Sequence, residues 1–363
     1  MSKKNIVSCM LTVIVTLFFQ PLKAQQNSTN IIQTGAIFLL TTPDARGAAM
    51  GDGGVATSPD ESSLHWNPAK IAFLENQVGV TTSYAPWLRS LTSDTNLYYL
   101  SGYYHLSERN TISAAIRYFS LGIIQLMDAS ANSLGTYNPY ELAFDGAFAR
   151  RFNDHFSIGV ALRYIKSSLS NGQFLNNQQR QAAVGFAVDV SGYHTQDINL
   201  FGKKSKLNMG INISNIGPRI RYQTNGTGVN LPTNLKLGAA TTIDIDDDNK
   251  FTLSLDLNKL LVPTNNDATS SVASSVFSSF SNPGGLKTIS YSLGTEYWLK
   301  QQFALRLGYF YEHPSMGNRR YATTGAGFKY QSFSLDVAYV LANPEVTPLA
   351  QTLRFTLGFN FKK

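Results

Sequence analysis

Cysteine is nearly absent from this chain: Cys9 is the only one among 363 residues. It lies inside an apolar run at positions 6–19, which two lysines precede and a small residue, Ala24, follows. This pattern predicts a secretory signal peptide over residues 1–24. A lipoprotein cysteine would follow the apolar run, so lipid attachment at Cys9 is not expected. Without residues 1–24 the chain has no cysteine, which excludes disulfides, a thiolate nucleophile and a cysteine metal site.

Long apolar runs and charges are also scarce. Beyond residue 19 no stretch approaches the ~20 apolar residues that a membrane-spanning helix needs. Only 15% of the residues are charged, whereas 12% are aromatic, and the mean hydropathy is −0.12. Neutral hydropathy combined with many Tyr and Phe residues is typical of strands that turn one face to lipid and the other to water.

The net charge argues against one class of partner. Without Lys3, Lys4 and Lys23, 27 basic residues stand against 23 acidic ones, a net charge of +4. This excess is small, and the sequence has neither a basic run nor an RNA-binding motif. Nucleic acid is therefore not an expected partner.

From Val78 onward, apolar and polar residues alternate with a period of two. At 251–257, for example, Phe and Leu alternate with Thr, Ser and Asp. About fourteen strands are predicted, near 78–86, 96–107, 110–120, 140–152, 155–167, 180–190, 206–214, 234–243, 250–259, 288–298, 302–312, 321–330, 332–340 and 352–361. The predicted fold is therefore all-β, a transmembrane antiparallel up-and-down β-barrel of about fourteen strands over residues 78–363.

The links between these strands alternate in length. Tight turns such as Glu108-Arg109 alternate with long links such as 121–139, 215–233 and 260–287. Strands that cross a membrane up and down give this pattern, whereas a soluble β-sandwich of this length would need two cores and gives no reason for it. We expect the tight turns and both chain termini in the periplasm and the long links outside. The 191–205 connection is an exception, because it is a long link on the side of the short turns.

Aromatic residues collect near the predicted strand ends, where they would form girdles at the two lipid headgroup layers. Tyr84, Trp87, Tyr118 and Tyr164 are expected at the outer rim. The last strand ends in alternating aromatic residues, Phe359 and Phe361, which is typical of outer-membrane barrels. These features predict a location in the outer membrane of a Gram-negative bacterium.

The stretch from Leu39 to Leu74 differs from the rest, because it is glycine-rich and carries helix-start signals. Thr42-Pro43-Asp44 should begin a short helix that Gly51 ends. Ser58 and Glu61 fit a capping box, and Asn67-Pro68 should start a third helical turn. Residues 25–77 are therefore predicted to form a compact N-terminal helical plug inside the barrel.

Several motifs resemble the PorV family of outer-membrane barrels of the type IX secretion system. The motifs are P-D-A-R-G-A-A-M-G-D-G-G-V-A-T at 43–57, H-W-N-P-A-K at 65–70, S-Y-A-P-W-L-R at 83–89 and R-Y-F-S-L-G at 117–122. The N-P-A at 67–69 is also similar to the wider FadL-like family of transporters for hydrophobic compounds. The resemblance extends from about Ile31 to the C-terminus, and the plug residues it carries over are Asp44, Arg46, Trp66, Asn67 and Pro68.

The resemblance implies a role in protein secretion. Proteins of this family bind the giant translocon barrel (SprA, also called Sov) and collect secreted cargo through the cargo's C-terminal domain. They deliver it to a surface attachment complex that contains the sortase PorU. A FadL-like importer of hydrophobic small molecules is the alternative, and an outer-membrane lipid hydrolase comes third.

Catalysis and cofactors are not expected. The five histidines lie in no recognisable hydrolase motif, and no G-x-S-x-G occurs. Asp244, Asp246 and Asp248 have the spacing of a calcium loop, but its glycine and terminal Glu are missing, which favours a solvated turn. The predicted function is therefore that of a binding protein without a metal or cofactor.

Two further features concern the lumen and the outer loops. Charges of both signs fall on inward-facing strand positions, which favours a structural network that holds the plug through Asp44, Arg46 and Asp52 over a permeation path. In the 260–287 loop, apolar residues at helical spacing predict either a partner-binding helix or a disordered serine-rich loop. The candidate partner-binding residues are Val272, Val276, Phe277 and Phe280. Arginines at 219, 221, 319 and 320 could meet lipopolysaccharide phosphates or an acidic partner.

Overall fold

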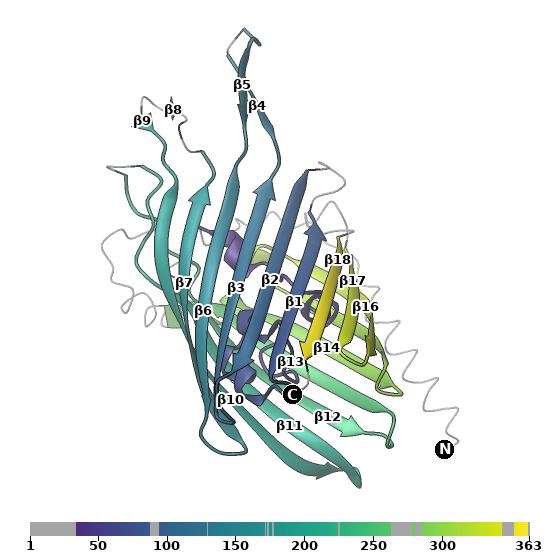
Figure 1. Cartoon of the computed structure of the whole chain (residues 1–363). Helices are drawn as coiled ribbons and strands as arrows, with labels where there is room; N and C mark the ends of the chain where they lie inside the picture. Colours follow the sequence, from purple (N-terminus) through teal and green to yellow (C-terminus); the bar gives the residue numbers. More distant parts are fainter. Residues whose placement is uncertain are drawn as a thin grey trace.

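Fourteen strands close into one antiparallel barrel in the computed structural model (Figure 1). The structure describes residues 34–87, 94–128, 130–170, 172, 174–175, 178–223, 226–262, 279–280, 285–342 and 352–361. The barrel strands are β1 (Val78–Pro86), β2 (Thr95–His105), β3 (Asn110–Leu121), β6 (Tyr140–Arg151), β7 (Phe156–Ser168), β10 (Ala183–Leu200), β11 (Lys203–Ile216), β12 (Asn234–Asp244), β13 (Lys250–Leu260), β14 (Ile289–Leu299), β15 (Phe303–Tyr311), β16 (Arg320–Tyr330), β17 (Phe333–Leu341) and β18 (Leu353–Phe361). Each pairs with its neighbours in the chain, and β1 pairs with β18 to close the barrel. The predicted fold class and strand number are confirmed.

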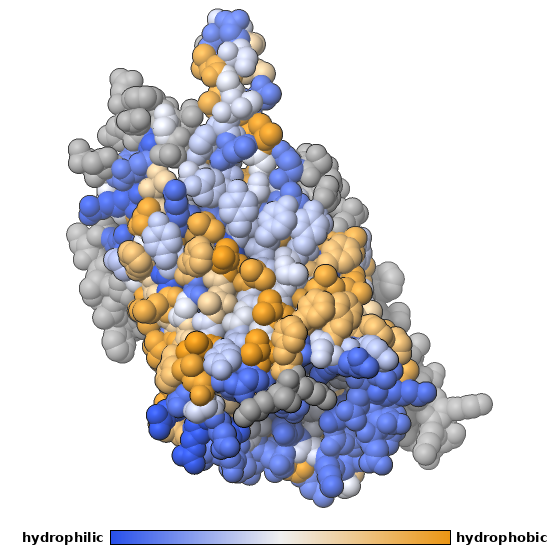
Figure 2. All heavy atoms as spheres, viewed as in Figure 1, coloured by the Kyte–Doolittle hydropathy of each residue, from blue (hydrophilic) through white to orange (hydrophobic). Residues whose placement is uncertain are grey.

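The alternation read from the sequence is the alternation of the two barrel faces. In β13, Leu253 and Leu255 are exposed on the outer face, whereas Thr252, Ser254 and Asp256 are buried in the lumen. Figure 2 shows the result on one side of the molecule, where apolar side chains form a band and hydrophilic ones gather below it. A band of exposed apolar residues around a closed sheet is what a lipid bilayer requires of a barrel.

The two ends of the barrel differ. We call the end with the tight turns the turn end, and the end with the long links the loop end. At the loop end, β4 (Ile124–Met127) and β5 (Ser133–Tyr137) form a two-stranded ribbon that projects well beyond the barrel (Figure 1). A second small pair, β8 (Phe174–Leu175) and β9 (Gln178–Gln179), lies in another link at this end. The short helices η3 (Gly285–Thr288) and η4 (Pro314–Met316) also belong to links at this end.

The predicted long link at 191–205 is wrong. β10 continues to Leu200 and β11 begins at Lys203, so only Phe201 and Gly202 form the turn. Both have positive φ, 54° and 75°, as a two-residue hairpin turn requires. Residues 195–199, which are polar except for Ile198, lack the apolar alternation of a strand in the sequence, but their backbone is paired with β11. The link-length alternation therefore has no exception here.

Residues 34–77 lie inside the barrel and form short helices. These are η1 (Ile37–Leu40), α2 (Ala45–Ala49), α3 (Ser63–Trp66) and η2 (Pro68–Phe73). α2 packs against β15–β18, whereas η2 packs against β6, β7 and β10 on another part of the wall. None of the helices in the described part of the chain is long and apolar enough to span a membrane.

Two helix-start details differ from expectation. The N-cap of α2 is Asp44 rather than Thr42, because the Asp44 carboxylate accepts the Gly47 amide. Glu61 is not part of a capping box, because it accepts a hydrogen bond from the Asn360 side chain of β18. The start of η2 at Asn67-Pro68 agrees with the prediction.

The segment inside the barrel runs from one end to the other. Near its start, the Gly35 amide donates to the Asn230 carbonyl in the β11–β12 link, 2.9 Å away, at the loop end. Its exit, Val78, pairs with Phe361 at the turn end. The first and last described residues therefore lie at opposite ends of the barrel. The periplasmic location of both termini stays a prediction, because residues 1–33 lie outside the described part of the chain.

Trp87 is not part of an outer girdle. Its ring packs edge-on against Phe119, with 5.8 Å between ring centroids, and the Arg354 guanidinium lies 5.8 Å from the ring centre. Both partners face the lumen. The residue follows β1, where the chain turns inward and the strand alternation no longer holds.

Candidate functional site

The plug is organised around Trp66. The Asp44 carboxylate accepts hydrogen bonds from the Trp66 indole (2.8 Å) and from the Gly47 amide at the start of α2 (2.7 Å). Gly47 and Gly54 both lie against the indole, where a Cβ on either would overlap the ring. Burial raises the pKa of Asp44 from 3.8 to about 6, and the charge of Asp60 adds to this shift.

Arg46 links the plug to the wall. Its guanidinium donates to both carboxylate oxygens of Glu296 on β14, at 2.8 and 3.0 Å, and to Asp60 of the plug at 2.8 Å. Glu296 also accepts from Arg306 of β15 (2.7 Å), which in turn bonds Asp336 of β17 (2.6 Å). Paired and hydrogen-bonded charges of this kind are the form in which ions persist in a buried site. Arg46 therefore binds the plug directly to β14, and Glu296 links this contact to β15 and β17 through Arg306.

Asp52 makes a second ionic contact with the wall. Its carboxylate accepts hydrogen bonds from Arg354 of β18 (3.2 Å) and from the Tyr321 hydroxyl of β16. The neighbouring Gly51, with φ of 73°, lies so close to Gly308 of β15 that a Cβ on Gly308 would overlap its amide nitrogen. Glycine on both sides allows the plug backbone to pass directly against the strand.

Asn67 and Pro68 fix the far part of the plug. The Asn67 amide oxygen accepts the Ala69 backbone N–H (3.0 Å), and its nitrogen donates to the carbonyls of Val55 (3.2 Å) and Gly192 of β10 (3.0 Å). Pro68 occupies the first position of η2, where its missing N–H costs nothing. Asn67 thus caps η2 and ties it to the wall with one side chain.

The structure brings all six predicted plug residues together inside the barrel. Arg46, Asp52 and Asn67 bond to the wall with their side chains. The side chains of Asp44 and Trp66 instead bond to each other within the plug, so Asp44 does not hold the plug to the wall through its carboxylate as predicted.

Sequence reasoning missed Lys70, whose ammonium is fully buried and donates to the Gly54 carbonyl (2.7 Å) and Thr57 hydroxyl (3.1 Å). Burial lowers its pKa from 10.5 to about 8. Lys70 ends the H-W-N-P-A-K motif, so the signal was present. A lysine that follows apolar residues usually extends its ammonium into water, and only the tertiary structure shows that the Lys70 ammonium is enclosed.

The wall supplies a carboxylate acceptor to the plug backbone and pairs its other inward-facing charges with one another. Asp256 of β13 accepts the amides of Gly54 (2.6 Å) and Val55 (2.9 Å). Arg163 of β7 forms an ion pair with Asp189 of β10 (3.0 Å) and also bonds Asp145 of β6. These inward-facing charges are engaged in a structural network, as the interspersed signs indicate.

Arg117 of β3 binds neutral acceptors of the plug and not a carboxylate. Its guanidinium donates to the Leu39 carbonyl (3.0 Å) and lies 2.6 Å from Nδ1 of His65. Burial lowers the pKa of His65 well below its usual value, and the Arg117 charge adds to the shift. A neutral imidazole can accept the guanidinium N–H, so Arg117 connects η1 with α3.

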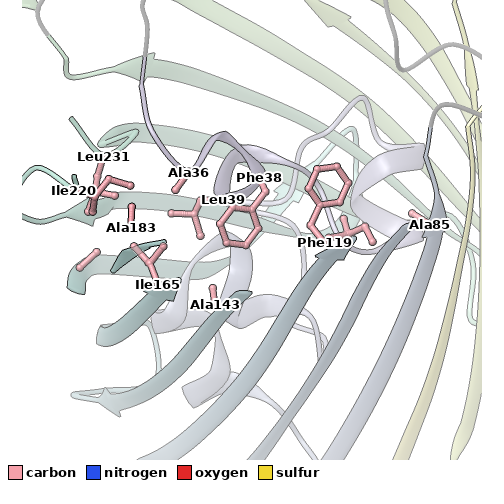
Figure 3. Packing of buried hydrophobic residues seen from close by; sticks show 12 residues of the cluster. Ala36, Phe38, Leu39, Ala85, Phe119, Ala143, Ile165, Ala183, Ile220 and Leu231 are labelled. Atoms are coloured by element: carbon pink, nitrogen blue, oxygen red, sulfur yellow. The ribbon is translucent and has the colours of Figure 1, made fainter. Parts of the chain in front are cut away.

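An apolar cluster lies between η1 and the wall toward the loop end (Figure 3). Phe38 and Leu39 of η1 meet wall residues from β2, β3, β6, β7 and β10 and from the β11–β12 link. The other buried members of the cluster on the wall are Ala85 of β1, Leu97, Phe119, Ala143, Ile165, Ala183, Ala187, Ile220 and Leu231. The lumen is therefore filled by apolar packing near the loop end and by charged contacts further in.

The candidate partner-binding loop is only partly visible. Val272, Val276 and Phe277 lie outside the described residues. Phe280 is exposed, and the Lys259 ammonium lies 5.1 Å from its ring centre. Of the outer arginines, Arg319 forms an ion pair with Glu312 (2.8 Å), and Arg219 donates to Asn230 (2.9 Å).

The aspartates of the β12–β13 turn do not form a calcium loop. The Asp246 carboxylate accepts the amides of Asp248 (3.0 Å) and Asn249 (2.8 Å) and so caps the turn. Across the residues that the structure describes, no group of three His, Cys, Asp or Glu side chains could hold a metal ion.

A closed barrel with an apolar outer band and a filled, ion-paired lumen defines the class of an outer-membrane β-barrel protein. The family model of the type IX secretion system protein PorV matches residues 23–267, about two thirds of the chain. The chain belongs to this family and is an outer-membrane component of that secretion system. No curated protein matches the sequence.

Solved structures show the same fold at low sequence identity. The CymD monoaromatic hydrocarbon channel matches with a TM-score of 0.54 and 11% identity, over 91% of this chain and 100% of that one. The P. putida toluene transporter TodX matches with a TM-score of 0.53 and 10% identity, over 88% and 99%. At this identity the likeness establishes the shared barrel fold and nothing about ligands.

Proposed function

We propose that this protein is a cargo adaptor of the type IX secretion system. It binds secreted proteins through their C-terminal domains at the giant translocon barrel (SprA or Sov). It then delivers them to the attachment complex that contains the PorU-type sortase. The family membership supports this role, and the filled lumen fits it, because a protein cargo has no way through a barrel whose interior is occupied.

The single observation that carries the adaptor mechanism is the plug–wall contact. Arg46 binds Glu296 of the wall, and Asp52 binds Arg354 and Tyr321 of the wall. The apolar cluster of η1 fills the lumen nearer the loop end. Opening this lumen would break the two buried ion pairs between plug and wall, Arg46–Glu296 and Arg354–Asp52, and would leave buried charges without their partners. Recognition of cargo and translocon is therefore assigned to the exposed links at the loop end, which faces the cell exterior in this proposal.

The 260–287 loop is the proposed partner contact. It is the longest link at the loop end, and its described residue Phe280 exposes an apolar ring. Exposed aromatic residues are frequent anchors of protein interfaces. Val272, Val276 and Phe277 would extend the same apolar stripe.

The test is deletion of residues 263–284, with deletion of residues 343–350 at the same end as the matched control. Loop shortening costs little stability, and β13 and β14 keep their pairing, so both variants should show heat-modifiable migration on gels. The first deletion should abolish secretion and co-purification of the translocon, whereas the control should retain both. Normal secretion by the first variant would show that the loop is not the contact.

A FadL-like importer of hydrophobic small molecules is the second candidate. The apolar cluster around Phe38 and Leu39 supports it, because an apolar site near the loop end could take a hydrophobic ligand if η1 moved. The fold is shared with proteins described as a toluene transporter and a hydrocarbon channel. Co-purification from mild detergent separates the two: a bound giant barrel supports the adaptor, and bound hydrophobic ligand without protein partners supports the importer.

A further inference from the structure

The barrel closes where its first and last strands, β1 and β18, meet, and we call this line the seam (Figure 1). β18 pairs with β1 only from Val78 to Tyr84 and with β17 only from Phe333 to Tyr339. These are the shortest ladders between neighbouring strands in the described part of the barrel. Because backbone hydrogen bonds between paired residues hold strands together, β18 has less backbone support than the other strands.

The last strand presents three polar side chains to the lumen, and each contacts the plug. They are Arg354, Thr356 and Asn360, all of which are buried. Arg354 donates a hydrogen bond to the Asp52 carboxylate of the plug (3.2 Å). The Thr356 hydroxyl accepts the backbone N–H of Ala45 at the start of α2 (2.8 Å). The Asn360 side chain donates to the Glu61 carboxylate. The plug therefore binds β18 at three positions along the strand.

Two of these side chains also bond across the seam. Thr356 shares a hydrogen bond with the Ser83 hydroxyl of β1 (2.8 Å). Asn360 accepts a hydrogen bond from the Tyr103 hydroxyl of β2 (3.0 Å). The second contact passes over Gly79 of β1, where a Cβ would overlap both side chains. Glycine at this position therefore allows β18 to bond beyond its immediate neighbour.

Arg354 makes a third contact across the seam, near the loop end. Its guanidinium lies 5.8 Å from the ring centre of Trp87, which directly follows β1. From Arg354 to Asn360 the strand extends about 20 Å at ~3.3 Å per residue. All three side chains thus join the plug to the β1 side of the seam, so the seam is held from inside along most of its length.

We propose that the plug holds the barrel seam closed, so that displacement of the plug separates β18 from β1 and opens the wall at this place. The order of the chain fits such a device. The plug leads directly into β1 at Val78, which pairs with Phe361 at the end of β18. The plug, the first strand and the last strand therefore meet at one point of the fold. This inference rests on these contacts and does not depend on the proposed secretion role.

Hydrogen exchange of backbone amides, followed by mass spectrometry on the purified full-length protein in lipid bilayers, tests the proposal. Two variants change the plug and leave every strand residue in place. Glu61→Met removes the acceptor of the Asn360 side chain. Asp52→Gly removes the acceptor of Arg354, and glycine tolerates the positive φ of 56° at this position.

We expect amide exchange at the seam to rise at least tenfold in each variant. The rise should lie at the turn end of the seam in Glu61→Met and at the loop end in Asp52→Gly, while β6 and β7 exchange as in the wild type. Ser157→Ala is the matched control, because it removes a plug–wall hydrogen bond to the Ala69 carbonyl (2.7 Å) on β7, away from the seam. Its seam exchange should equal that of the wild type.

A disulfide across the seam provides a second measurement. Val80 and Phe359 are cross-strand partners with exposed side chains on the outer face, and a Cα separation of about 4.5–5.5 Å suits a disulfide. Residues 25–363 contain no other cysteine. Oxidation of Val80→Cys with Phe359→Cys in the Glu61→Met background should return the seam exchange to the wild-type level.

Unchanged seam exchange in both plug variants would overturn the proposal. An equal rise in Ser157→Ala, or around the whole barrel, would also overturn it, because the plug would then support the wall in general. A rise that persists after the disulfide has formed would show that β18 does not separate from β1. If one plug variant lacks heat-modifiable folding, the other variant decides the outcome.

Discussion

Arg46 in the plug and Glu296 in β14 form a bidentate ion pair with nitrogen–oxygen distances of 2.8 and 3.0 Å across 250 positions of the chain. Both side chains are largely shielded from solvent, so the pair is screened little by water or salt. Arg306 binds the same carboxylate from β15. One carboxylate therefore neutralises a plug cation and a wall cation together, which makes closure of the lumen depend on Glu296.

We expect Glu296→Gln to destabilise the folded barrel by about 3–5 kcal/mol, because two buried arginines lose their shared counter-ion. Urea unfolding in bilayers measures this cost. Arg46→Met with Glu296→Gln completes a double-mutant cycle, and the pair should show a coupling of about 1–3 kcal/mol. Additive costs would mean that the two residues do not act together.

Asn67→Leu should loosen the plug, because it removes the cap on η2 and two hydrogen bonds to the carbonyls of Val55 and Gly192. The expected cost is about 2–3 kcal/mol for the cap and the carbonyls left unpaired. Asn67→Ser keeps a capping oxygen and should cost less. Single-channel recording should show a closed baseline for the wild type and openings for Asn67→Leu; a closed baseline in both would argue against the plug function.

Asp44 should make plug stability depend on pH. Its folded pKa is about 6 against 3.8 in the unfolded chain, so between these values the folded state binds the extra proton. Stability from this group therefore falls as pH rises from about 4 to 6, by up to ~3 kcal/mol at 1.36 kcal/mol per pKa unit, and is constant above. Asp44→Asn keeps an acceptor for Gly47 and should remove this slope. Parallel pH profiles of unfolding for both proteins would contradict the assignment.

Leu255→Arg should destabilise the barrel by about 2–4 kcal/mol, because Leu255 points from β13 toward lipid. Leu255→Phe keeps the apolar face and serves as the control, with little expected change. Folding titrations into lipid bilayers compare the two. An equal effect of both substitutions would place this position away from the lipid midplane.

The sequence by itself determined that the chain forms a barrel and which strand residues face lipid or the lumen. The period of two is a local property, so it places Leu255 outside and Asp256 inside without knowledge of any strand partner. The same holds for the strand number and for the start of η2 at Asn67, since a cap is read from neighbouring residues. The plug residues Asp44, Arg46, Trp66 and Asn67 were singled out by the resemblance of their motifs to the PorV family, and their functional role stays a prediction.

Tertiary structure decided what depends on distant partners. Residues 195–199 became strand because β11 pairs with them, and Trp87 turned inward because Phe119 and Arg354 form its contact surface. Ser254 was assigned to the lumen by alternation, but only the folded chain shows it packed beside Gly294 rather than facing water. Glu61 and Lys70 found their partners in the same way. Backbone pairing and buried charge contacts join residues that are far apart in the chain. A local sequence pattern does not specify which distant residue will be the hydrogen-bond or ion-pair partner.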